Sequence, residues 1–292
     1  MTDFLTVLAL AYLAVLAFMY FNQRNMLYFP DKNRPDPAAY GAQGMVEIAR
    51  VTTKDGLALE GWYFPPLNPG GLVIVNFHGN AARMADRVQK MADFINGRGY
   101  GVLLAEYRGY GGNPGAPSEQ GFYEDGRAYL DWLREKGIGP AQTVLYGESL
   151  GTGVAIQMAT DQSEGAYAAV ILESPYSTLA EVAQSIYFYL PVKFLMKDQF
   201  RSIDKIAAIK APLLIIHGAQ DRTIPLRFAR RLFQAAVQPK SFEVLDAAGH
   251  NDLYNHGAAA LVLDFLKTPG FSVPEVKTIE EIPDNALPCG DD

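Results

Sequence analysis

The stretch GESLG, residues 147–151, lies between an apolar run, TVLY, and a helix-like run, TGVAIQMAT. It places Ser149 between two glycines where an apolar strand would turn sharply into a helix. Small flanking residues allow so tight a turn, because larger side chains would collide with the neighbouring strand and helix. The turn would expose the serine hydroxyl at the positive end of the helix. The pattern predicts a nucleophile elbow; an ordinary turn serine is the alternative.

Short apolar runs alternate with helical stretches on both sides of this turn. The runs are nearly continuous in apolar residues, as expected of strands buried on both faces. Strand–helix alternation predicts an α/β fold, with a mostly parallel sheet wound by right-handed crossovers and flanked by helices. Two earlier segments around Asp55-Gly56 predict a hairpin, which brings the sheet to eight strands. The expected strands are VEIARVTT (46–53), LALEGWYF (57–64), LVIVNF (72–77), GVLLAE (101–106), TVLYG (143–147), AAVILE (168–173), LLIIH (213–217) and SFEVL (241–245).

Three of the expected strands are followed by side chains of complementary chemistry. Ser149, Asp221 and His250 come just after the strands at 143–147, 213–217 and 241–245. The chemistry of parallel α/β sheets lies beyond the carboxyl ends of the strands. A serine hydroxyl also needs a base within hydrogen-bond reach, and that base needs an orienting group. These positions therefore predict a Ser-His-Asp triad.

The base has rivals among the four histidines. His256 follows His250 by six residues, but it lies in an expected helix, whereas His250 lies in the glycine-led loop after the last strand. His78 and His217 each begin an HG pair at the end of a strand, which is more typical of a structural histidine that binds loop backbone. We therefore favour His250 as the base.

The orienting acid has rivals as well. Glu173 and Asp246 both stand near strand ends. Asp221 follows its strand after a short GAQ loop, a position that suits a buried carboxylate next to the base. We therefore favour Asp221 as the acid.

The amino end of the chain is apolar. Residues 4–21, FLTVLALAYLAVLAFMYF, contain no charged side chain, and about 17–25 such residues cross a bilayer as a helix. A cleaved signal peptide would need a basic start and a small-residue cleavage site, and neither is present. A buried core helix would show an amphipathic period, which is also missing. The run predicts a single-pass transmembrane helix, with the lipid bilayer as the partner of this segment.

The predicted organisation has three parts: a membrane anchor at 1–25, a catalytic domain at 26–267 with a small insert at about 178–211, and a tail at 268–292. Arg24, Lys32 and Arg34 follow the apolar run, and the positive-inside rule then places the catalytic domain in the cytoplasm. The tail carries four prolines and six acidic residues, a composition typical of disordered, solvated segments.

Charge and cysteine content exclude several classes of function. The net charge of −7, without a basic patch, argues against a nucleic-acid partner. The single cysteine, Cys289, rules out an intramolecular disulfide and a cysteine-based metal site. With four histidines and no HExxH motif we expect no metal, and the triad chemistry requires no cofactor.

Eight motifs between residues 26 and 252 resemble the α/β-hydrolases of the membrane-anchored Bem46-like group, near the eukaryotic α/β-hydrolase domain-containing proteins 13 and 17. The resemblance implies that Ser149 is the nucleophile, His250 the base and Asp221 its orienting acid. It also implies an oxyanion hole made by the backbone N–H groups of Asn80 and Leu150. The motifs are MLYFP (26–30), FHGNA (77–81), YRGYG (107–111), PSEQG (117–121), GESLG (147–151), ESPYS (173–177), HGAQD (217–221) and GHND (249–252).

The activity expected from this set is hydrolysis of an acyl ester or thioester by a membrane-anchored serine hydrolase, acting on a small acyl or lipid-like substrate. Two alternatives remain: a serine peptidase or amidase that uses the same triad, and a non-catalytic membrane-tethered scaffold. The segment SIYFYLPVKFLM, residues 185–196 within the insert, is rich in aromatic and aliphatic residues. It predicts either a lid that lines an acyl pocket or an ordinary helix that covers the sheet.

Overall fold

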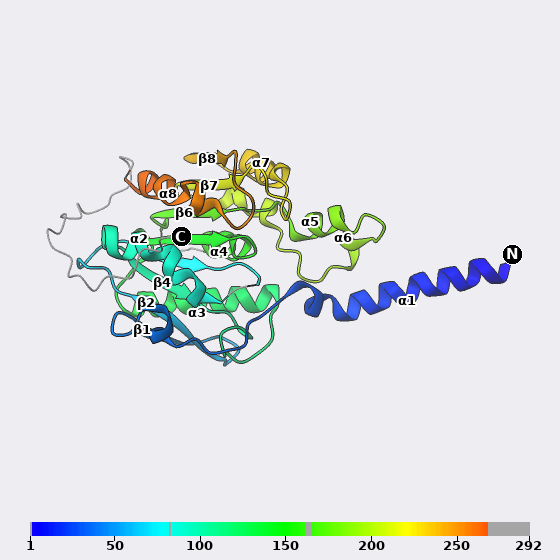
Figure 1. Cartoon of the computed structure of the whole chain (residues 1–292), viewed down its shortest axis with the longest axis horizontal. Coiled ribbons are helices and arrows are strands. Elements are labelled where there is room, and N and C mark those ends of the chain that lie inside the picture. Colours follow the sequence, from blue (N-terminus) through cyan, green and yellow to red (C-terminus); the bar gives the residue numbers. More distant parts are fainter. Residues whose placement is uncertain (1, 82, 162–164, 268–292) are drawn as a thin grey trace.

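The computed structural model describes residues 2–81, 83–161 and 165–267 (Figure 1), so the predicted tail at 268–292 lies outside the described residues. The predicted eight-stranded, mostly parallel sheet is confirmed. Its strand order is β1-β2-β4-β3-β5-β6-β7-β8; β2 pairs antiparallel with both β1 and β4, and all other neighbouring strands pair parallel. The strands are β1 (Glu47–Thr52), β2 (Ala58–Phe64), β3 (Val73–Phe77), β4 (Gly101–Ala105), β5 (Thr143–Glu148), β6 (Ala169–Glu173), β7 (Leu213–Gly218) and β8 (Lys240–Leu245).

The sheet has an apolar layer on each face because successive side chains of a strand point to opposite sides. In β3, Val73, Val75 and Phe77 join one buried cluster, whereas Ile74 joins the other. The first cluster includes apolar side chains of α3 (Glu119–Glu135), α4 (Gly151–Thr160) and α7 (Leu226–Ala235). The second includes those of α2 (Val88–Arg98) and α8 (Ala258–Leu266). Helices therefore flank both faces, as the apolar runs predict.

Helix α3 begins at Glu119, directly after Ser118. The Ser118 side chain accepts a hydrogen bond from the backbone N–H of Gly121, 3.1 Å away, and so caps the helix at its amino end. This cap adds the first turn, from Glu119 onward. The helix ends at Glu135, two residues before Gly137, which adopts a positive φ of 81°.

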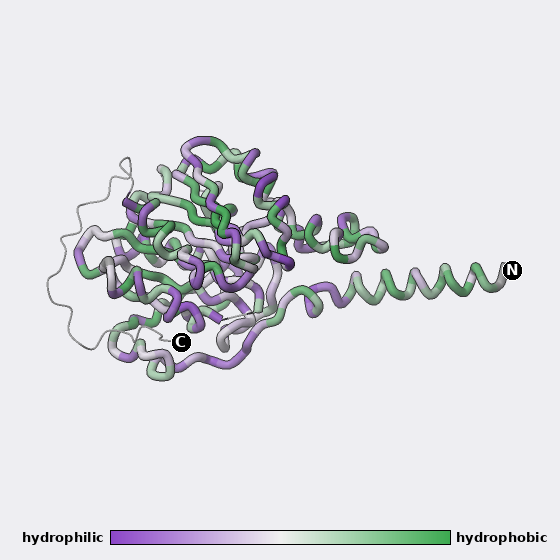
Figure 2. The backbone as a smooth tube through the Cα atoms, turned by 45° about the horizontal axis from the view of Figure 1, so that its top comes forward, coloured by the Kyte–Doolittle hydropathy of each residue, from purple (hydrophilic) through white to green (hydrophobic). Residues whose placement is uncertain are grey.

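Helix α1 (Thr2–Leu27) projects away from the body as an apolar rod, as Figures 1 and 2 show. It is longer than the uncharged run at 4–21. Phe4–Leu27 is long and apolar enough to cross a membrane, and none of its most apolar stretch is buried; a signal sequence would have the same properties. The insert at 178–211 forms α5 (Leu179–Ile186), α6 (Val192–Leu195) and two short 3-10 turns. It projects on the same side of the molecule as α1.

Candidate active site

The turn between β5 and α4 holds Ser149 in a left-handed backbone conformation, with a φ of 49°. Such a φ is strained for a residue other than glycine, and strain of this kind occurs at functional turns. A Cβ atom on Gly147 would lie 2.6 Å from Cα of Thr152, and one on Gly151 would lie 2.0 Å from the carbonyl oxygen of Phe77. The two flanking glycines are therefore needed because backbone fills the space around the turn.

The structure brings Ser149, His250 and Asp221 together from three separate loops. His250 Nε2 lies 3.0 Å from Ser149 Oγ, and His250 Nδ1 lies 2.7 Å from Asp221 Oδ2. The other carboxylate oxygen of Asp221 accepts hydrogen bonds of 2.8 Å from the backbone N–H groups of Thr223 and Ile224. An ionised carboxylate only accepts hydrogen bonds. His250 Nδ1–H therefore donates to Asp221, which leaves Nε2 to accept the proton of the serine hydroxyl.

The backbone N–H groups of Asn80 and Leu150, which the resemblance implies form an oxyanion hole, belong to segments that lie next to Ser149. The loop after β3 runs against the serine turn: a Cβ atom on Gly79 would lie 3.4 Å from Cβ of Ser149. Within the part of the chain that the structure describes, neither N–H group has a hydrogen-bond acceptor. Both donors thus remain available to a bound oxygen next to the serine.

The side chain of Asn80 has a role that sequence reasoning missed. Its Nδ2 donates to the carbonyl oxygen of Leu27, at the end of α1. Its Oδ1 accepts hydrogen bonds from the Phe29 N–H at 3.3 Å and from the Tyr110 hydroxyl at 3.1 Å. Leu27, Phe29 and Tyr110 belong to the motifs MLYFP and YRGYG, to which we assigned no role. These two motifs were the available signal that segments outside the triad support the loop after β3.

Comparison with known proteins places the chain in a family. Residues 69–197 match the Hydrolase_4 family model, described as serine aminopeptidase, S33. The Mycobacterium tuberculosis protein Rv2307c is 40% identical over 248 residues, which cover 84% of this chain and 86% of that protein. The chain belongs to the α/β-hydrolase family.

The chain is also similar to a second relative and to a solved structure. The zebrafish (Danio rerio) lysophosphatidylserine lipase ABHD12 is 32% identical over 196 residues, and the match covers 62% of this chain but only 51% of that protein. The Pyrococcus furiosus esterase Pf2001 has a similar structure, with a TM-score of 0.64 and 20% identity over 82% of this chain and 98% of that one. At that identity the likeness shows the fold alone.

The charge on Asp221 is stabilised in this α/β-hydrolase. Burial by itself would raise the pKa of its carboxyl group, but hydrogen bonding to His217 and His250 and to backbone N–H groups lowers the pKa well below the usual range. His217 Nε2 lies 3.3 Å from Asp221 Oδ2 and 2.8 Å from the carbonyl oxygen of Ile224. Asp221 therefore stays ionised at neutral pH, so it can hold the imidazole of His250 in one tautomer.

The rival histidines and acids of this α/β-hydrolase have other contacts. His256 lies 3.5 Å from Asp252, and Glu173 accepts hydrogen bonds from Lys90 and Tyr146. Asp246 is exposed. Among the described residues, no side chain of the three rivals forms a hydrogen bond with Ser149 or His250; Glu173 accepts from the Ser149 N–H only through its backbone carbonyl oxygen, at 2.8 Å. His78 and His217 contact loop carbonyl oxygens, as expected of structural histidines.

A buried cluster of charged side chains surrounds the residue that precedes the serine of this α/β-hydrolase. Glu148, next to Ser149, forms ion pairs with Arg87 at 2.8 Å and Lys90 at 2.9 Å, and it accepts a hydrogen bond of 2.7 Å from the Asn76 side chain. Burial by itself would raise the pKa of Glu148, but the two cations and the hydrogen bonds lower it to about 2. The residue before the serine is thus held by charge as well as by the strand.

Proposed function

We propose that this protein is a serine hydrolase that cleaves an acyl ester or thioester and that α1 anchors it in a membrane. The observation that carries the proposal is the hydrogen-bonded chain from Ser149 through His250 to Asp221. A strained serine, a base within reach and a buried acid that orients the base are the features of nucleophilic acyl transfer.

In the proposed reaction, Ser149 Oγ attacks the acyl carbonyl carbon while His250 Nε2 takes its proton. Asp221 holds the imidazole in place and stabilises its positive charge. The tetrahedral intermediate collapses as His250 protonates the leaving alcohol or thiol, which gives an acyl-enzyme. Water then attacks this ester with His250 as base, which releases the carboxylic acid and restores the serine.

The backbone N–H groups of Asn80 and Leu150 would stabilise the oxyanion of each tetrahedral intermediate. Both are adjacent to Ser149 and have no acceptor of their own among the described residues. Leu150 also precedes α4, whose positive end favours a developing negative charge. Losing one oxyanion donor reduces the rate by about 10²–10³ in enzymes of this type.

Membrane anchoring by α1 is supported by its length, its uncharged apolar run at residues 4–21 and its projection from the body. The basic residues Arg24, Lys32 and Arg34 follow the apolar run, which favours a cytoplasmic catalytic domain. A lipid-like ester is a reasonable substrate class, since such a substrate shares the membrane with the enzyme. The similarity to a protein named as a lysophosphatidylserine lipase also supports a lipid-like substrate.

The test is covalent labelling of the full-length protein in detergent by a fluorophosphonate probe, together with turnover of p-nitrophenyl butyrate. We expect Ser149→Ala to abolish both while its circular dichroism spectrum and melting temperature stay close to those of the wild type. Ser241→Ala is the matched control because Ser241 lies near the amino end of β8, whereas Ser149 lies beyond the carboxyl end of its own strand. Unchanged labelling of Ser149→Ala would remove this serine from the mechanism.

A peptidase or amidase is the second candidate, favoured by the description of the matching family model as a serine aminopeptidase. The same triad serves amides, so turnover of aminoacyl p-nitroanilides must be compared with turnover of acyl esters. A higher kcat/KM for the anilides would favour the second candidate. A well-folded wild type that neither reacts with the probe nor turns over either substrate would instead indicate the non-catalytic scaffold.

A further inference from the structure

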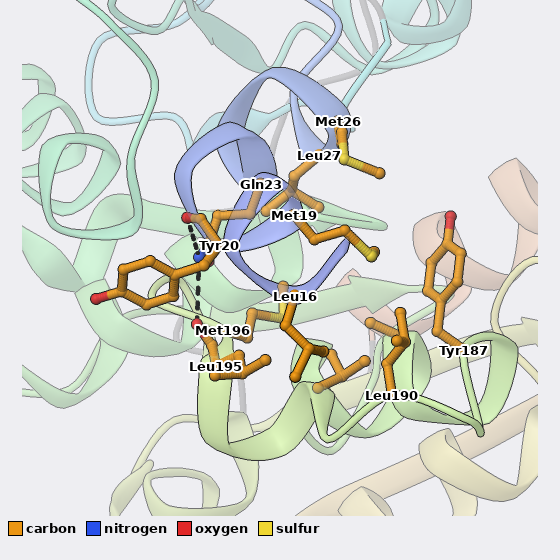
Figure 3. A pocket seen from close by; sticks show the side chains of 12 residues that line it. Leu16, Met19, Tyr20, Gln23, Met26, Leu27, Tyr187, Leu190, Leu195 and Met196 are labelled. Atoms are coloured by element: carbon orange, nitrogen blue, oxygen red, sulfur yellow. Dashed lines mark hydrogen bonds between the residues drawn. The ribbon is translucent and has the colours of Figure 1, made fainter. Parts of the chain in front are cut away.

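Helix α1 and the insert at 178–211 form one unit. The Arg24 guanidinium binds both carboxylate oxygens of Asp198, at 2.7 and 3.0 Å. Gln23 donates to the carbonyl oxygen of Leu195 at 3.2 Å and accepts from the backbone N–H of Lys197 at 2.7 Å. Figure 3 shows Gln23 between the two segments. These polar contacts fix the insert against the apolar helix, although more than 170 positions separate them in the chain.

The insert carries an exposed apolar surface, which we call the insert tip: Ile186, Phe188, Tyr189 and Phe194. Phe188 is 81% exposed and Phe194 is 88% exposed. Of the seven exposed large hydrophobic residues that the described chain has outside α1, four belong to the insert tip. A concentration of this kind marks an interaction surface, and it is continuous with the apolar surface of α1.

Side chains donate hydrogen bonds to backbone carbonyl groups in and next to the insert tip. Gln184 Nε2 donates to the carbonyl oxygens of Tyr187 and Leu190, at 3.2 and 2.8 Å. The Tyr12 hydroxyl donates to the carbonyl oxygen of Tyr189 at 3.1 Å. Backbone polar groups in a bilayer must be satisfied within the protein because the hydrocarbon offers no partner. These contacts satisfy three carbonyl oxygens in and next to the insert tip without water.

The contact with Tyr12 indicates how deep in a bilayer the insert tip would lie. Tyr12 lies nine positions before Phe21, the last residue of the uncharged run, and a rise of 1.5 Å per residue puts it about 14 Å further along the helix. One leaflet contributes about 15 Å of hydrocarbon. If α1 crosses the bilayer, the insert tip therefore lies inside the same leaflet.

An apolar pocket of about 120 Å³ separates α1 from the insert. Leu16, Met19 and Leu27 line it from α1, and Tyr187 and Leu190 line it from the insert, as Figure 3 shows. Ser149 and His250 do not line it. Leu27, however, accepts the hydrogen bond from Asn80 in the loop beside Ser149. Leu27 thus both lines the pocket and contacts the loop that holds Asn80.

We propose that the insert tip enters the same leaflet as α1 and that the pocket between them takes an acyl chain of a bilayer lipid, whose ester group then reaches Ser149. This inference rests on the proposed function and deepens it: the substrate is a membrane-resident acyl ester drawn directly from the bilayer. Lys197 Nζ lies 4.3 Å from the centre of the Tyr20 ring, near the end of the uncharged run, where lipid headgroups would lie; this favours a leaflet with anionic lipids.

The depth of the insert tip is tested without reference to activity. Full-length Phe194→Trp is reconstituted in vesicles of phosphatidylcholine with one fifth phosphatidylglycerol, in which part of the phosphatidylcholine carries brominated acyl chains. We expect the fluorescence of the introduced tryptophan to be quenched above the background of the two native tryptophans. Val237→Trp, exposed on the body, is the matched control and should show no added quenching. Equal quenching of the two variants would overturn the proposal.

The source of the substrate is tested by comparing p-nitrophenyl palmitate dissolved in these vesicles with soluble p-nitrophenyl butyrate. In Phe188→Ser/Phe194→Ser, we expect kcat/KM for the vesicle substrate to fall roughly tenfold or more, because two phenylalanines no longer bury apolar area in the leaflet. Turnover of butyrate should stay within about twofold of the wild type. Leu67→Ser/Val237→Ser is the matched control and should leave both rates unchanged. Vesicle turnover at the wild-type rate in the tip variant would contradict the proposal.

The pocket is tested by Ala183→Phe, which fills it from α5. We expect this variant to lower kcat/KM for the palmitoyl ester much more than kcat/KM for the butyryl ester, because only the long chain needs the pocket. Equal effects on both chain lengths would show that the acyl chain does not occupy the pocket. A wild type inactive on both esters and unlabelled by the fluorophosphonate probe would instead contradict the proposed function, while the quenching experiment would still report the depth of the tip.

Discussion

The side-chain amide of Asn80 donates a hydrogen bond to the carbonyl oxygen of Leu27, the last residue of α1. The backbone N–H of the same asparagine is the proposed oxyanion donor. The end of the proposed membrane anchor is therefore one hydrogen bond away from the loop that would stabilise the transition state. A hydrogen bond of this kind contributes about 0.5–1.5 kcal/mol, and here it also fixes the position of a reacting group.

Asn80→Ala should lower kcat for p-nitrophenyl butyrate by roughly tenfold, because the loop loses its bonds to Leu27, Phe29 and Tyr110 and the oxyanion donor shifts. KM should change little, since the backbone donor acts mainly in the transition state. Steady-state kinetics of the full-length protein in detergent measure both. Tyr110→Phe removes only one of the three bonds and should have a smaller effect. A wild-type kcat in Asn80→Ala would show that the side chain does not position the loop.

Asp221→Asn should lower kcat by about 10⁴ while the protein stays folded, because an amide in place of the carboxylate favours the wrong imidazole tautomer. The measurement is single-turnover acylation by p-nitrophenyl butyrate, with thermal melting as a check on folding. Asp246→Asn, an exposed rival acid, is the matched control and should retain wild-type turnover. Comparable losses in the two variants would argue against Asp221 as the orienting acid.

Glu148 should make the fold sensitive to acid. Its pKa is about 2 in the folded protein against an ordinary value of 4.5, so its ionised form stabilises the fold above pH 4.5. That contribution is lost as the pH falls from 4.5 toward 2. Glu148→Gln should therefore melt at a lower temperature at pH 7 and lose less stability between pH 5 and pH 3 than the wild type. Thermal unfolding across this pH series tests the expectation, and parallel curves for the two proteins would contradict it.

Gly151→Ala should prevent stable folding. The added Cβ would lie 2.0 Å from the carbonyl oxygen of Phe77, so the backbone of β3 or α4 would have to move. We expect a loss above about 4 kcal/mol, which is exceptional for one substitution, visible as insoluble protein or a large drop in melting temperature. Gly139→Ala is the control, because a Cβ there meets nothing within 4 Å and its φ of −85° suits alanine. A soluble, active Gly151→Ala would show that the turn can relax.

Much of the fold could be predicted from the chain alone because its signals are local. Apolar runs of strand length separated by amphipathic helices indicate a parallel sheet, and the structure has the expected eight strands. The start of α3 was harder to predict, because it depends on a cap at Ser118 that lies outside the apolar pattern. The sequence also predicted where Ser149, Asp221 and His250 lie, because a parallel sheet brings the carboxyl ends of its strands to one edge.

The amino-acid sequence by itself determined the alternation of strands and helices, the serine turn with its two glycines and the apolar character of α1. Each of these depends on residues close together in the chain. Only the tertiary structure decided that α1 lies against the insert, through Arg24 and Asp198, and that Leu27 supports Asn80. The physical reason is that these contacts join segments distant in the chain through shape and single hydrogen bonds, and such contacts leave no periodic signal along the sequence.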